Sequence, residues 1–511
     1  MSAFADALAE VLGRVPPLLA SHVLLSAAAL GLAVLIAAPL AIWSARRPGV
    51  ARVALGFASL VQTIPSLALL ALFFPLLLSL SALVGGSIPA LGFLPSLLAL
   101  TLYALLPLLR NGVAGLTGID LAVREAADAV GMTPWQKLRL VEAPLAAPVA
   151  VAGLRTAAVW TIGAATLSTT VGQPSLGDLI FAGLQTQSWS LVLAGCVAAA
   201  ALALSVDAAI GLVERGVATR RRPLWAGAAL ALLAGLTLAA WPLASRTGGE
   251  RVVVGAKNFS EQYILARLIG ARLERAGYDV EYRDGLGSAV VFGALAAGEV
   301  DVYVDYAGTI WTNEMRRSDV PERRAMLKAI AEWTARERGV RMLGALGFEN
   351  AYAFAVRPGS GLRTLDDLAL ASRRLRLGSD LEFLERPEWA AVRRAYPMRF
   401  ASATPYSPTF MYRALESGRV DAITAFSSDG RIAADRLTVL ADPRRAIPRY
   451  DALLLVSPEP AGDKRFTAAL RPLVGRIPVE AMREANLQVD RDTDKQTPEQ
   501  AAERLARWVG L

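Results

Sequence analysis

The sequence predicts a helical membrane domain followed by a water-soluble α/β domain of two lobes. The first observation is charge placement, because the first 249 residues hold 23 charged side chains and the remaining 262 hold 75. The second is a set of about six apolar runs in the first half. The third is a strand–helix alternation that begins at Arg251. With 54% hydrophobic residues, the chain is too apolar for one soluble globule.

The apolar runs predict six spans within residues 1–245. They lie near 20–43, 54–80, 88–109, 146–168, 190–213 and 224–244. Pro65 and Pro75 fall in the second run, where we expect kinks. The sixth run has two interpretations, because Arg220–Arg222 precede it and Pro242–Ser245 follow, as in a signal peptide inside a fused chain. Its length favours a retained span.

Basic residues predict the orientation of these spans. Eleven lie in the loops after the first, third and fifth runs, whereas Arg14 and Arg246 lie on the other side. The positive-inside rule places the three basic loops in the cytoplasm and everything after residue 245 outside. Of the net charge of +8, the first half carries +5, which sits in loops and therefore reports orientation in a cell (inner) membrane, and we expect no nucleic-acid partner.

Single polar residues of the first half have modest roles in this interpretation. His22, the only histidine, is expected at a membrane interface, and Cys196, the only cysteine, is expected to pack. Arg155 lies inside the fourth run, where it snorkels to the inner interface, marks a later start of the span or contributes to a pathway. We expect no metal site and no cofactor.

The longest polar interruption of the first half is the loop 110–145. Glu125, Ala126 and Ala127 belong to a predicted short amphipathic helix that Gly131 ends. A second helical turn is predicted from Met132 to Pro134. A short helix with small residues on one face fits a groove on another protein, although an ordinary loop has the same composition.

These residues, with Ala143-Pro144 further on, resemble the EAA loop of ABC importer permeases. The resemblance implies that Glu125, Ala126, Ala127 and Gly131 couple to an ATPase subunit at the cytoplasmic face. Two further stretches resemble permeases of glycine betaine/choline importers, namely Ser59–Ser66 and Gly153–Ala157. We also expect the permease to be a homodimer. None of the five lysines follows a glycine, so the chain has no nucleotide-binding P-loop of its own.

The second half, 250–511, reads as alternating strands and helices. Strands are predicted at 252–255, 280–282 and 300–304, with helices between them, and a second such unit lies at about 363–455. This βαβαβ order predicts parallel sheets with binding at the strand ends. We expect lobe 1 at about 250–355 and 456–511, and lobe 2 at about 356–455, around a cleft.

Several motifs of this half resemble the substrate-binding proteins for glycine betaine, choline and carnitine. They are Lys257–Gln262, Gly285–Ser288, Asp301–Thr309, Asn350–Ala353, Phe383–Pro387, Phe426–Gly430 and Pro448–Asp451. The resemblance implies a two-lobed periplasmic-binding-protein-like (type II) fold outside the membrane and a small betaine-type ligand. Members of this family also bind ergothioneine, and fusion of permease and binding domain occurs in it.

The chemistry of such a ligand matches the aromatic residues present. A quaternary ammonium has no N–H to donate and is held by ring faces. The resemblance implies a cage of Tyr306, Tyr352, Phe426 and Tyr450, where Phe426 replaces the usual tyrosine. It also implies that Arg386 binds the ligand carboxylate, with Thr309 and Lys257 as helpers. Asp305 and Asp429 either order the cleft or contact the cation.

The sequence therefore predicts an uptake transporter subunit that captures and translocates a betaine, powered by a separate ATPase. Glycine betaine, choline and carnitine are the first candidates, and ergothioneine or another betaine not used as an osmoprotectant is the alternative. A ligand-gated channel or membrane-anchored sensor shares the plan of a binding domain joined to spans, but the predicted cytoplasmic face has only short loops. An enzyme is not expected, because the sequence has no catalytic constellation.

Overall fold

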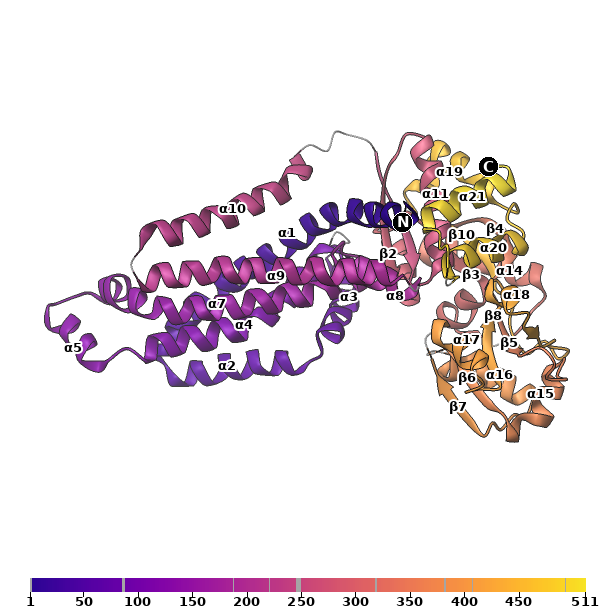
Figure 1. Ribbon diagram of the computed structural model, residues 1–511, viewed down its shortest axis with the longest axis horizontal. Helices are drawn as coiled ribbons and strands as arrows, with labels where there is room; N and C mark the ends of the chain where they lie inside the picture. The colour runs from indigo at the N-terminus through magenta and orange to yellow at the C-terminus, as the bar shows by residue number, and fades with distance from the viewer. Residues whose placement is uncertain are drawn as a thin grey trace. The chain divides into compact units, whose positions relative to one another are not determined.

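The structure, a computed structural model, describes residues 2–84, 88–186, 188–219, 221–244, 250–317, 319–380, 383–406, 408–491 and 493–511. The chain forms two compact units. One comprises Met1–Gly183 and Trp189–Gly248, and the other comprises Leu184–Ser188 and Gly249–Leu511. Figure 1 shows the first in indigo to magenta as a set of long helices and the second in rose to yellow as strands with covering helices.

The first unit contains the six predicted spans. Within the described residues, six helical segments are long and apolar enough to cross a membrane: Gly13–Arg46, Ser66–Leu83, Phe93–Thr117, Pro134–Val171, Trp189–Ala218 and Arg222–Trp241. They belong to α1 (Ser2–Arg46), α3 (Ser66–Leu83), α4 (Phe93–Thr117), α6 (Pro134–Lys137) continuing into α7 (Ala143–Ala165), α9 (Trp189–Ala218) and α10 (Arg222–Ala244). The all-helical membrane domain is confirmed.

The second predicted run, 54–80, is not one kinked helix. It is divided into α2 (Pro48–Thr63) and α3, which begins after Ile64 and Pro65. Ile64 is extended with φ −75° and ψ 126°, as expected for a residue that precedes proline. Pro75 lies inside α3 without ending it. A proline can therefore end a helix or lie within one, and the presence of proline alone does not predict which of these occurs.

Small residues hold the helices of the first unit together. Ala33, Ala37 and Ala41 of α1 are buried against α4 and Ala157 of α7. Gly153 of α7 lies so close to α4 that a Cβ there would come within 2.5 Å of the Cβ of Asn111. Close approach through small side chains is the usual basis of packing between membrane helices.

Two polar residues of this unit are held more firmly than expected. His22 is fully buried within the protein, with Nε2 3.0 Å from the Ile162 carbonyl and Nδ1 3.3 Å from the Leu176 amide. It therefore ties α1 to two distant segments. Arg155 of α7 donates to both carboxylate oxygens of Asp207 in α9, at 2.5 and 2.7 Å, rather than snorkelling alone.

The loop 110–145 contains the predicted short helix. It is α5 (Leu121–Ala129), which Asp120 caps by accepting from the Ala122 amide at 2.9 Å. Gly131 follows with φ +76°, and the Met132 amide reaches back to the Ala127 carbonyl at 3.2 Å, which closes a Schellman motif. The second turn is α6, which begins with a Thr133–Gln136 capping box.

The sixth span, α10, is continuous over 23 residues. Of the signal-peptide features that the sequence suggested around it, Arg220 and Ser245 lie outside the described residues. Retention of this span stays a proposal.

The second unit contains two five-stranded sheets. The first has the order β2-β1-β3-β10-β4 and the second the order β7-β6-β8-β5-β9. The first sheet consists of β1 (Arg251–Lys257), β2 (Asp279–Leu286), β3 (Val302–Tyr306), β4 (Arg341–Glu349) and β10 (Asp451–Val456). The second consists of β5 (Tyr352–Val356), β6 (Arg376–Ser379), β7 (Ser402–Pro405), β8 (Ala422–Phe426) and β9 (Thr438–Val439).

The sheets are mixed rather than parallel throughout. The predicted βαβαβ segment does form parallel pairs, β1 with β2 and β1 with β3, linked by α11 (Ser260–Arg275) and α12 (Ser288–Ala296). However, β10 runs antiparallel to both β3 and β4, and β5 runs antiparallel to β8 and β9. These antiparallel strands flank the two crossings of the chain between sheets, which the local helix–strand pattern could not reveal.

The two sheets suggest lobe borders a few residues from the predicted ones. The first crossing lies between β4 and β5, at 350–351, and the second between β9 and β10, at 440–450. β5 therefore belongs to the second sheet and β10 to the first. The helices that complete the first lobe include α20 (Val479–Asp490) and α21 (Pro498–Val509), which pack on α11. We retain the two-lobe division as a proposal with these borders.

Candidate functional site: an aromatic cavity with a buried guanidinium

The strand register brings four aromatic residues to facing edges of the two sheets. Tyr306 ends β3, and Tyr450 immediately precedes β10, which pairs with β3. Tyr352 begins β5 and Phe426 ends β8, and these two residues are direct cross-strand partners. Residues at the ends of neighbouring strands meet at one edge of a sheet, so each lobe contributes two rings.

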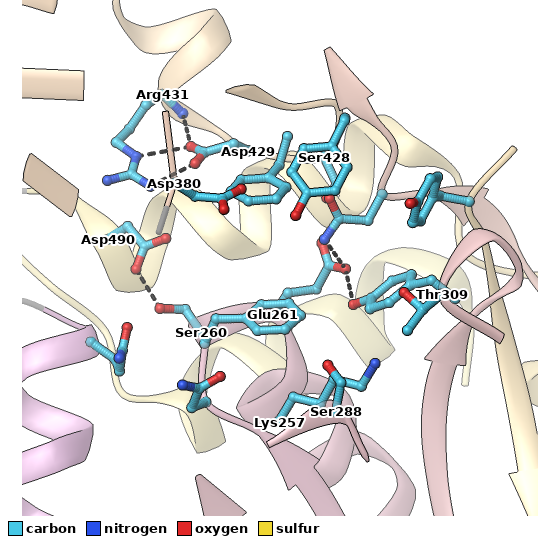
Figure 2. A pocket seen from close by; sticks show the side chains of 18 of the residues that line it. Lys257, Ser260, Glu261, Ser288, Thr309, Asp380, Ser428, Asp429, Arg431 and Asp490 are labelled. Atoms are coloured by element: carbon cyan, nitrogen blue, oxygen red, sulfur yellow. Dashed lines mark hydrogen bonds and ion pairs between the residues drawn. The ribbon is translucent and has the colours of Figure 1, made fainter. Parts of the chain in front are cut away.

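A cavity of about 250 Å³ in the second unit collects these rings. All seven residues predicted to bind ligand line it: Lys257, Tyr306, Thr309, Tyr352, Arg386, Phe426 and Tyr450. Further lining residues include Asn258, Phe259, Ser260, Glu261, Ser288, Asn350, Asp380, Ser428, Asp429, Arg431 and Asp490. Figure 2 shows several of these side chains pointing toward one another across the cavity.

Tyr352 is the centre of the aromatic group. Its ring centroid lies 5.2 Å from that of Phe426 and 5.8 Å from that of Tyr450, the latter at a right angle. Tyr306 lies against Phe259 at 6.1 Å in a stacked arrangement. Gly308 accommodates the Tyr450 ring, because a Cβ at that position would come within 2.5 Å of it. Rings at different orientations present several negative faces to one volume.

Arg386 is fixed by an acid that the sequence did not suggest. Its guanidinium donates to Glu388 at 3.1 and 3.3 Å and lies 5.5 Å from the Tyr352 ring centroid. Burial alone would raise the pKa of Glu388, but the Arg386 charge and hydrogen bonds hold it below its ordinary value. Glu388 also accepts from the Tyr450 hydroxyl, so one carboxylate positions both the cation and a ring.

Lys257 is paired within its own lobe. Its ammonium contacts the Asp305 carboxylate, and both side chains are buried. Asp305 also accepts from the Tyr303 hydroxyl at 2.5 Å and from the Tyr306 amide at 2.7 Å. Of the two roles considered for Asp305, ordering the cleft is the one that these contacts favour, and Asp305 is not among the lining residues.

A second polar group lines another part of the cavity. Asp429 accepts from Arg431 at 2.6 and 2.9 Å, and Asp490 accepts from the Ser260 hydroxyl at 2.5 Å (Figure 2). Burial, together with the nearby Asp429 charge, raises the pKa of Asp490 to about 6, against the opposing effect of Arg431. Because Asp429 pairs with Arg431, its charge is already balanced by a protein cation.

Sequence reasoning did not assign Glu261, Phe259 or Glu388 to the site. Glu261 and Phe259 lie in the Lys257–Gln262 motif, so their position was a usable signal. Glu388 was not identifiable, because it acts on Tyr450, which lies 62 residues away in the chain. Within the described residues, no group of three or more His, Cys, Asp or Glu side chains is arranged to hold a metal ion.

Comparison with known proteins identifies two families along the chain. Residues 250–507 match the substrate binding domain of ABC-type glycine betaine transport systems. Residues 36–219 match the inner membrane component of binding-protein-dependent transport systems.

Individual relatives agree with this division. The chain is 29% identical over 473 residues to the ergothioneine transport permease/ergothioneine binding protein EgtU of Helicobacter pylori (strain G27), covering 88% of this chain and 82% of the relative. It is 38% identical over 196 residues to the glycine betaine/carnitine/choline transport system permease protein OpuCB of Bacillus subtilis (strain 168), covering 38% of this chain and 85% of the relative.

Among solved structures, a glycine betaine/carnitine/choline ABC transporter superposes with a TM-score of 0.46 at 25% identity, covering 50% of this chain and 98% of that one. The two family matches follow one another in a single polypeptide that also has six apolar helices. The chain therefore belongs to the ABC importers of the glycine betaine transport type, as an inner membrane permease fused to its extracytoplasmic substrate-binding domain.

Proposed function

We propose that this chain captures a betaine-type quaternary ammonium compound outside the membrane and translocates it inward. The observation that carries the proposal is the convergence of four rings and a guanidinium from two lobes on one cavity. Ring faces attract a permanent cation that has no hydrogen to donate. A guanidinium matches the carboxylate at the other end of a betaine.

The seven lining residues take the roles that the family resemblance implies. Tyr306, Tyr352, Phe426 and Tyr450 hold the ammonium group, and Arg386 binds the carboxylate with help from Thr309. Lys257 acts indirectly, since its ammonium pairs with Asp305. The Tyr352 ring touches partners from both sheets, which suits closure of the lobes on the ligand.

Two ligand groups fit this proposal. Glycine betaine, carnitine and choline are named for the permease relative that matches the first half. Ergothioneine, itself a betaine, is named for the relative that aligns along 88% of the chain. Ergothioneine should be tested alongside the other compounds, because the relative named for it also combines a permease and a binding protein in one chain.

The motor is a separate ATPase subunit, and the chain itself is not an enzyme. The exposed surface of the loop 110–145 supports docking, since Leu121, Val130, Trp135 and Leu140 are 63 to 73% exposed. Several large apolar side chains exposed on one loop are typical of an interaction surface. We further propose that two permease domains form a homodimer, since one set of six spans is small for a closed pathway.

The test is binding to the full-length chain in detergent. Isothermal titration with glycine betaine, choline, carnitine and ergothioneine should show saturable binding of at least one compound. Tyr352→Ala should weaken it at least ~20-fold, because the central ring is lost. Tyr396→Phe, in the core of the second lobe, is the matched control and should leave affinity unchanged. No binding of any methylated ammonium compound would refute the proposal.

A further inference from the structure

Glu261 is a cavity residue whose charge is not matched by a protein cation. It lies in the first turn of α11, lines the cavity and is only 3% exposed. Three acids at or behind the cavity wall pair with cations: Asp305 with Lys257, Glu388 with Arg386 and Asp429 with Arg431. The lining acids Asp380 and Asp490 accept from the Phe383 amide and the Ser260 hydroxyl, and neither shares the donors of Glu261. In the part of the chain that the structure describes, none of the ion pairs includes Glu261.

Neutral donors hold the Glu261 carboxylate instead. One oxygen accepts from the Tyr306 hydroxyl at 2.6 Å and from the Asn350 amide at 3.0 Å. The other accepts from the Asn486 amide at 2.9 Å. Figure 2 shows this side chain rising among the lining residues, with dashed lines at its carboxylate. The carboxylate is thus fixed at the wall of the cavity, where it is hydrogen-bonded to the hydroxyl of Tyr306, one of the proposed cage residues.

We propose that Glu261 is the countercharge for the fixed positive charge of the ligand. This inference rests on the proposed function and assigns the residue that selects a cation over a neutral molecule of the same shape. Rings alone attract a cation weakly and also accept neutral apolar groups. A buried carboxylate attracts only the cation, and the low dielectric of the site strengthens that attraction.

The same arrangement makes ligand affinity depend on pH. Burial raises the pKa of the Glu261 carboxyl, against hydrogen bonds from Tyr306, Asn486 and Asn350. A bound cation favours the ionised form, so affinity is full above the Glu261 pKa of the ligand-free protein. It falls as pH drops through that pKa, by about tenfold per unit at the limit.

The pH dependence due to Glu261 must be distinguished from that of other titratable groups around it. Tyr306 faces Glu261 from β3. Three uncharged side chains also face it: Asn350 from the segment before β5, Ser428 from the segment after β8, and Asn486 from α20. Asp490 accepts from the neighbouring Ser260 and has a raised pKa of about 6, so its own titration would also make affinity depend on pH. The Asp490→Asn background removes this second contribution.

The experiment compares a cation with its neutral isostere on the full-length chain. The probes are glycine betaine and 3,3-dimethylbutanoate, in which carbon replaces the ammonium nitrogen. Glu261→Gln should weaken glycine betaine binding at least ~10-fold and leave the binding of the isostere unchanged or improved. Glu274→Gln, an exposed acid on the same helix, is the matched control and should change neither affinity.

Equal loss of both probes in Glu261→Gln, or no loss of either, overturns the inference. If wild type binds no quaternary ammonium compound, the proposed function fails instead, so the two failures are distinguishable. A second measurement does not depend on how well Glu261→Gln folds. In Asp490→Asn, the affinity for glycine betaine should still fall as pH is lowered from 7.5, and a profile that stays flat over the whole pH range in which the protein is folded would equally overturn the role of Glu261.

Discussion

The hydroxyl of Tyr306 and its ring make separable contributions to the cavity. The hydroxyl donates to Glu261 at 2.6 Å and accepts from Gln262 at 2.9 Å, while the ring faces the lining residues. We predict that Tyr306→Phe weakens betaine binding only several-fold, because it removes two hydrogen bonds within the cavity wall but keeps the ring. Tyr306→Ala should weaken it at least ~20-fold, because a ring face is lost as well.

Calorimetry on the full-length chain measures both effects. Tyr396→Phe is a fitting control, since it also removes a buried hydroxyl that bonds a carboxylate, Asp442, but outside the cavity. If Tyr306→Phe and Tyr306→Ala lose the same affinity, the ring contributes nothing and the aromatic cage is wrong.

The raised pKa of Asp490 predicts how the free energy of unfolding depends on pH. Its folded-state pKa of about 6 lies above the ordinary 3.8, so the folded chain favours the protonated form. The charged form therefore lowers stability above pH 6, and this loss disappears as pH falls toward 4. Asp490→Asn should raise the free energy of unfolding at pH 7.5 by up to about 3 kcal/mol, and by roughly half of that at pH 5.

Thermal unfolding of both proteins at the two pH values measures this difference. The asparagine retains an oxygen that can accept from Ser260, so the change isolates the charge. A larger stabilisation at pH 5 than at pH 7.5 would show that the burial of Asp490 does not raise its pKa.

For single residues, the sequence predicted which side chains line the cavity but not which carboxylates hold them in place. Tyr306 and Phe426 end strands, Tyr352 begins one and Tyr450 immediately precedes one, a placement that a sequence pattern displays. All seven predicted residues line the cavity, while their contact with a ligand stays a prediction. The partners Glu261 and Glu388 act on rings 45 and 62 residues away in the chain, and pairings of that span depend on topology.

The short helix α5 depends on one backbone conformation. Gly131 has φ +76°, and a Cβ there would meet no atom within 4 Å, so any penalty of a larger residue is conformational. We predict that Gly131→Val strains the end of α5 by about 1–2 kcal/mol and reorients it. Transport should fall strongly while ligand affinity stays unchanged, because the binding domain is not touched.

Ligand-stimulated ATP hydrolysis in proteoliposomes with the ATPase subunit measures this coupling. Gly49→Val in α2 provides the control, since a Cβ at Gly49 also meets open space and the backbone there is not left-handed. Equal hydrolysis in the two variants would remove α5 from the coupling route.

Elements with strong local signals were predictable, and those set by distant pairing were not. The end of α5 at Gly131 and the capping turn at Thr133 follow from residue type. The break at Ile64 and Pro65 was expected only as a kink, because a proline in an apolar run can either end a helix or lie within it. The antiparallel β10 was missed for another reason, since its partners β3 and β4 are more than 100 residues earlier in the chain.

For the whole molecule, the distribution of basic residues predicts which side each domain occupies. Eleven basic residues in three loops of the first half, against two on the other side, place α5 in the cytoplasm. The binding domain then lies outside, where its cavity meets the ligand before transport. This arrangement is a strict requirement of the proposed function, because capture and motor coupling must take place on opposite sides of one membrane.

Cysteine accessibility tests this requirement in a single chain. In a Cys196→Ser background, we predict that Glu503→Cys in α21 reacts with a membrane-impermeant maleimide in intact spheroplasts. Ala129→Cys in α5 should react only after the membrane is permeabilised, although both side chains are exposed in the structure. Equal reactivity after permeabilisation is the control for both thiols. If Ala129→Cys reacts in intact spheroplasts, α5 faces outward and cannot meet an ATPase, whatever the cavity binds.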